Sequence, residues 1–168
     1  MKNISKETYC SVHDFICQLN EEQHLSFLTR MNEKQPLFAP YIHSFVTEDV
    51  SQHGLASINF MTVFIIRCFD YEYGDLHEIT IEMLEEYDKR ASAWIARERK
   101  LTNIVKITKA CERNAGQRDI IEFIHVMIDG IGDLKSPFND KERQSVKLAI
   151  YNIIIMLNEQ VEKMNVEE

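Results

Sequence analysis

Four polar residues recur on one face of a predicted helix, with a spacing that suits metal binding. Arg118, Glu122, His125 and Asp129 fall within a sector of about 60° when 100° is allowed per residue. Glu122 and His125 have the Glu-x-x-His spacing by which helical bundles present a carboxylate and an imidazole to one metal ion. One hypothesis is therefore a helical-bundle metalloprotein that uses Glu122, His125 and Asp129, with His77 as a further ligand.

The same stripe also has a purely structural explanation. On a solvent-facing helix surface, Arg118 with Glu122 and His125 with Asp129 are i,i+4 pairs, each contributing roughly 0.2–0.5 kcal/mol. His77 could join the stripe only if the helix that follows Asp75 faces this one. The sequence favours the surface explanation, so we expect no cofactor and keep a transition metal as the alternative.

A basic segment is the second candidate site. Residues 89–118 carry nine basic and two acidic side chains, a net charge of +7 within a total of −8, so the rest of the chain carries −15. A row of four basic residues projects from one side of a helix, which is the footprint of a phosphate-backbone contact: Arg99, Lys106, Lys109 and Arg113.

The charge of the neighbouring segment weakens that hypothesis. The stretch from Asp75 to Asp88 is acidic, and acids early with bases late complement a helix dipole without any ligand. The acidic remainder of the chain would repel a nucleic acid. We therefore expect a protein partner, with weak nucleic-acid binding through residues 89–118 as an alternative.

The elements that must position these residues are helices. Apolar residues recur at steps of three and four along most of the chain, and the sequence has five Gly and three Pro. Capping boxes are predicted at Asn20, Asp75 and Asn139. Residues 58–69 have the helical period, residues 76–114 form one helix or two with a break near Thr102, and residues 133–138 are a loop. The sequence predicts an all-α, single-domain helical bundle of six to eight helices over residues 1–168.

The last predicted helix, which extends from about residue 139 to Met164, is unusually apolar. Its steps of four and three place Val146, Ile150, Ile153 and Leu157 in one stripe, and nine of the ten residues from 148 to 157 are apolar. A helix that is apolar all round lies at the centre of a bundle or is shared with a second subunit. We expect self-association, as a homodimer, through these four residues.

Compartment and cysteine use follow from the remaining patterns. The amino terminus is polar, and the longest apolar window has twelve residues where a bilayer needs about 20, so we expect a cytoplasmic protein with no membrane span. The four cysteines show no CxxC pairing, and we expect reduced, mostly buried thiols. Cys10 and Cys17 lie seven residues apart on one helix face, as core residues or as the start of a metal site.

No spacing assembles a catalytic triad, and Gly130-Ile-Gly132 closes a helix where a dinucleotide fingerprint would open one. The leading prediction is a non-enzymatic helical module for protein-protein interaction that associates with itself.

Overall fold

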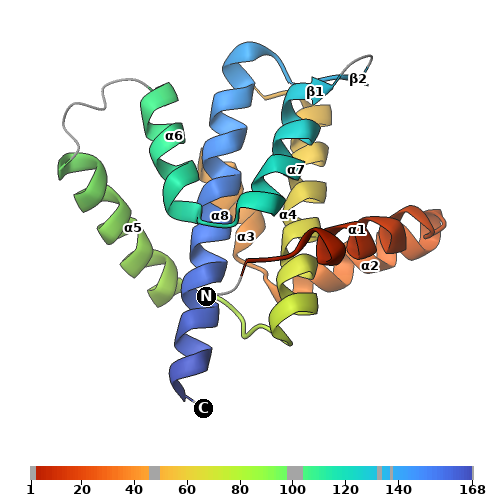
Figure 1. Cartoon of the computed structure of the whole chain (residues 1–168), viewed down its shortest axis with the longest axis horizontal. Helices are drawn as coiled ribbons and strands as arrows, with labels where there is room; N and C mark the ends of the chain where they lie inside the picture. Colours follow the sequence, from red (N-terminus) through yellow and green to blue (C-terminus); the bar gives the residue numbers. More distant parts are fainter. Residues whose placement is uncertain (1–2, 46–49, 98–103, 132–133, 137, 168) are drawn as a thin grey trace.

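The computed structural model describes residues 3–45, 50–97, 104–131, 134–136 and 138–167. In these ranges the chain is a helical bundle (Figure 1), and its eight helices confirm the predicted fold class. They are α1 (Lys6–Cys17), α2 (Glu21–Lys34), α3 (Phe38–Phe45), α4 (Gln52–Tyr73), α5 (Ile81–Arg97), α6 (Ile104–Ala115), α7 (Arg118–Asp129) and α8 (Asp140–Glu167).

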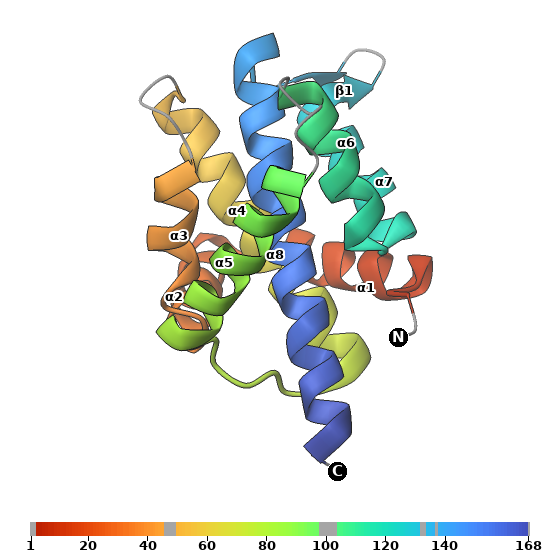
Figure 2. The same cartoon turned by 90° about the vertical axis from the view of Figure 1, so that its left-hand side faces the viewer.

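Helix α8 forms the centre of the molecule. It passes between the other helices in both views (Figure 1, Figure 2) and packs against α3, α4, α6 and α7. The four residues of its predicted stripe are fully buried within the chain, as are Tyr151 and Ile154. The apolar sequence of α8 predicts a helix either at the centre of the bundle or shared with a second subunit. In the structure, α8 lies at the centre of the bundle.

The structure contains two of the three capping boxes that the sequence predicts. Asn20 accepts from the backbone N–H of Gln23 while the Gln23 side chain accepts from the backbone of Asn20, both at 2.9 Å. Asn139 and Glu142 make the same reciprocal pair at the start of α8. Each pair satisfies backbone N–H groups that the first turn leaves without a partner.

The third predicted capping box, at Asp75, is wrong. Helix α5 begins six residues later, at Ile81, and Thr80 caps it by accepting from the N–H of Met83. Asp75 instead binds the ammonium of Lys34, with Nζ and Oδ1 2.6 Å apart. Lys34 also binds both oxygens of Asp70 at 2.9 Å, which ties the end of α2 to the end of α4.

Two further predictions concern the connections. The 76–114 segment forms two helices, α5 and α6, and the residues between them lie outside the described ranges. Residues 133–138 are predicted to be a loop, but two of them form β2 (Leu134–Lys135). This strand pairs with β1 (Gly130–Ile131) in an antiparallel ladder that joins Gly130 to Lys135 and Ile131 to Leu134. Gly130, with φ of 74°, ends α7 in a conformation that favours glycine.

Buried amides join helices that are distant in sequence. Gln117 Oε1 accepts from the N–H of Ile4 at 2.7 Å, and its Nε2 donates to Asn158 Oδ1 at 2.9 Å. Asn158 donates in turn to the carbonyl of Ala115. Paired in this way, the polar groups can be buried without the cost of lost hydrogen bonds, and they hold the amino terminus against α8.

No described helix is long and apolar enough to cross a membrane.

Candidate functional site

The predicted stripe of Arg118, Glu122, His125 and Asp129 does not converge on one point, because its members bind different partners. Glu122 is exposed and accepts from Arg118 Nε at 3.0 Å, the i,i+4 pair of the surface explanation. Asp129 binds Lys147 Nζ of α8 at 2.6 Å. His125 is half-buried, and its Nε2 shares a hydrogen bond with the hydroxyl of Tyr151. Burial, followed by the nearby Lys147 charge, lowers the pKa of His125 from that of a free imidazole.

His77 lies in the connection from α4 to α5, and its side chain is exposed. Its backbone carbonyl accepts from Nε2 of Gln35 at 2.7 Å and from Nε2 of Gln160. Within the ranges that the structure covers, no three His, Cys, Asp or Glu side chains form a group that could hold a metal ion. The four predicted ligands, Glu122, His125, Asp129 and His77, are therefore not brought together as a metal centre.

A second Glu-x-x-His spacing, from Glu21 to His24, lies at the start of α2. His24 uses its Nε2 to bind the carbonyl of Ile16 at 2.7 Å. This ring holds the end of α1 against α2, a structural task.

The predicted basic row is exposed where the structure describes it. Lys106, Lys109 and Arg113 project from α6 into solvent, while Arg99 lies outside the described residues. Acidic Glu112, on the same helix, is half-buried. The row is thus a surface feature and not part of the core.

The predicted self-association stripe is not on the surface. Val146, Ile150, Ile153 and Leu157 each have no exposed area, because α4, α6 and α7 cover α8. These four residues build the core of a single chain, so they cannot also face a second chain in this fold.

The cysteine prediction is half right. Cys68 and Cys111 are buried, and burial raises the pKa of the Cys111 thiol to about 11. Cys10 and Cys17 are exposed, so their shared face of α1 is not core. The seven-residue spacing correctly places both cysteines on one face of α1, but it does not show whether that face packs against the core or faces solvent.

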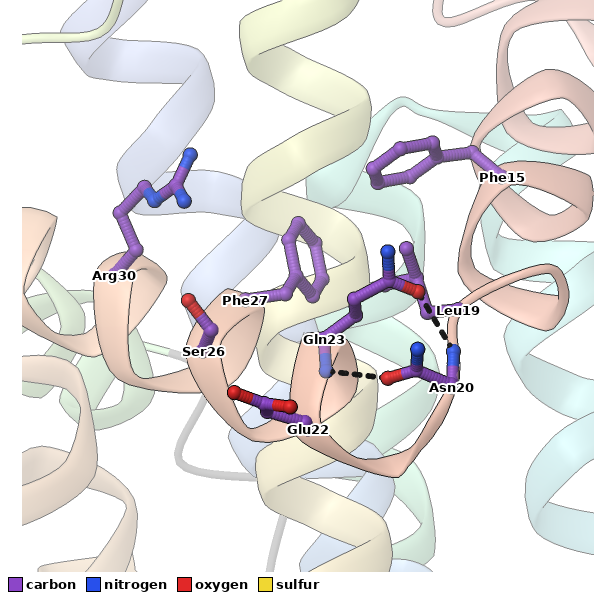
Figure 3. Close-up of a pocket in the computed structure, with 8 residues that line it drawn as sticks. All are labelled: Phe15, Leu19, Asn20, Glu22, Gln23, Ser26, Phe27 and Arg30. Atoms are coloured by element: carbon purple, nitrogen blue, oxygen red, sulfur yellow. Dashed lines mark hydrogen bonds between the residues drawn. The ribbon is translucent and has the colours of Figure 1, made fainter.

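A groove that the sequence did not indicate lies between α1 and α2. It has a volume of about 460 Å³, and Figure 3 shows Phe15 of α1 and Phe27 of α2 facing each other across it. Their ring centroids are 5.8 Å apart in an edge-to-face arrangement. Phe15 remains 45% exposed. The other lining residues are Leu19, Asn20, Glu22, Gln23, Ser26 and Arg30.

Along α2, the groove presents a charged row with a small residue at its centre. Glu22, Ser26 and Arg30 follow one another at intervals of four, are all exposed, and appear in that order in Figure 3. Within the described part of the chain, neither Glu22 nor Arg30 forms an ion pair. Leu25 flanks the row and is 67% exposed.

One sequence feature could have indicated this surface. Leu25 is an apolar residue that lies about 60° from Leu28 around the axis of α2, at the edge of the apolar positions of the helix, and the structure leaves it in solvent.

The chain matches no family model, no curated protein and no solved structure, so its function must be argued from this geometry.

Proposed function

We propose that this protein is a helical protein-protein interaction module that associates with itself, and that α2 is the contact element. The observation that carries the proposal is the row Glu22, Ser26 and Arg30, which has opposite charges at equal distances from a small residue. A two-fold axis puts the same surface of both chains in contact, so that surface must complement itself.

An antiparallel pair of α2 helices satisfies that condition. With the axis at Ser26, Glu22 of each chain lies opposite Arg30 of the other, and two identical ion pairs form. Serine at the crossing point lets the helix backbones approach closely, since its side chain is small. Exposed ion pairs of this kind contribute about 0.2–1 kcal/mol each, so they select the orientation more than they supply affinity.

The apolar residues beside the row would supply the affinity. The two Leu25 side chains lie on the same side of the seam and would cover each other, and the partner helix would cover Phe15. Burying a large apolar side chain is worth about 1.5–3 kcal/mol relative to leaving it exposed. Two of the five large apolar side chains that are exposed in the described residues belong to this surface.

Light scattering coupled to gel filtration tests the proposal. The chain has a mass of 19.8 kDa, and we expect a species of about twice that mass that dissociates on dilution. A species of monomer mass that persists up to millimolar concentration would remove self-association from the account.

The exposed row on α6 supports a second candidate, weak binding to nucleic acid through Lys106, Lys109 and Arg113. Its affinity would fall by orders of magnitude between 50 and 200 mM salt, because phosphate contacts release counterions. Fluorescence anisotropy with a labelled duplex would detect it, and an absence of binding at 50 mM salt would exclude it.

A further inference from the structure

We draw no further inference here: the strongest candidate, the apolar groove of about 370 Å³ between α4 and α7 that is lined by Ala56, Ser57, Phe60, Met61 and Met127, carries no proposal because nothing in the structure shows what covers it.

Discussion

The role that the structure gives His125 differs from the one that its sequence spacing predicts. Its spacing to Glu122 suggested a metal ligand, yet its ring nitrogen binds the hydroxyl of buried Tyr151. Burial raises the pKa of Tyr151, so the hydroxyl keeps its proton. The pair joins α7 to α8 as a neutral hydrogen bond, so His125 has a structural role in this fold.

The lowered pKa of His125 predicts a dependence of stability on pH. The unfolded chain has a histidine pKa near 6.5, while burial and the Lys147 charge lower it in the folded state against the opposing charges of Glu112, Asp129 and Glu122. Below pH 6.5 the unfolded chain therefore binds more protons, so the free energy of unfolding decreases as the pH falls toward the folded-state pKa.

Urea denaturation between pH 5 and pH 7.5 measures this effect. His125→Gln should lose less stability than the wild type across that interval, whereas His77→Gln, which changes an exposed ring, should follow the wild type. Equal pH slopes for the wild type and His125→Gln would show that His125 does not titrate differently in the two states.

At the scale of elements, the helices could be predicted well because their signals are local. The 3.6-residue period of residues 58–69 and the capping pairs at Asn20 and Asn139 involve neighbours in sequence, and the structure has them all. The Asp75 box failed because Lys34 is 41 residues away in sequence and competes for the carboxylate. A sequence pattern cannot reveal such a partner.

The faces of the helices were harder to predict than the helices themselves. Cys10 and Cys17 share a face, but whether α4 and α7 cover that face depends on tertiary packing. The α1–α2 groove was missed for the same reason, since its two walls come from separate helices. The α8 stripe was recognised as apolar, and its position in the core follows from the helices that surround it.

The central position of α8 predicts a large effect of truncation in its core. Ile153→Ala removes a fully buried side chain and should lower the free energy of unfolding by about 2–5 kcal/mol. Ile81→Ala, at a residue that is 59% exposed, should change it by less than about 0.5 kcal/mol. Urea denaturation followed by circular dichroism compares the two, and equal effects would contradict the assignment of α8 to the core.

At the scale of the whole molecule, the net charge of −8 conceals surfaces of unlike character. A basic row on α6, an exposed thiol and imidazole on α1, and a charged row on α2 lie on different elements. The row on α2 differs from the others because its charges are arranged symmetrically about Ser26. That symmetry is the basis of our proposal that a second copy of the chain binds this surface.

Exchanging the charges of the α2 row tests that symmetry. In the proposed dimer, Arg30→Glu places like charges opposite each other twice, so it should weaken association at least about tenfold. Glu22→Arg should do the same, while the double variant restores opposite charges and should return the dimer affinity to within about threefold of the wild type. Sedimentation velocity at several concentrations measures all four proteins. Additive losses in the double variant would contradict the antiparallel pairing.

A cross-link at the symmetry axis tests the central claim most directly. In a background in which Cys10 and Cys17 are replaced by serine, Ser26→Cys puts two thiols at the crossing point, and mild oxidation should convert most of the protein to a covalent dimer. Thr29→Cys, exposed on the same helix but off the axis, is the matched control and should cross-link much less. Efficient dimer formation at Ser26→Cys alone is the predicted result, and equal or negligible cross-linking at both positions would contradict the account.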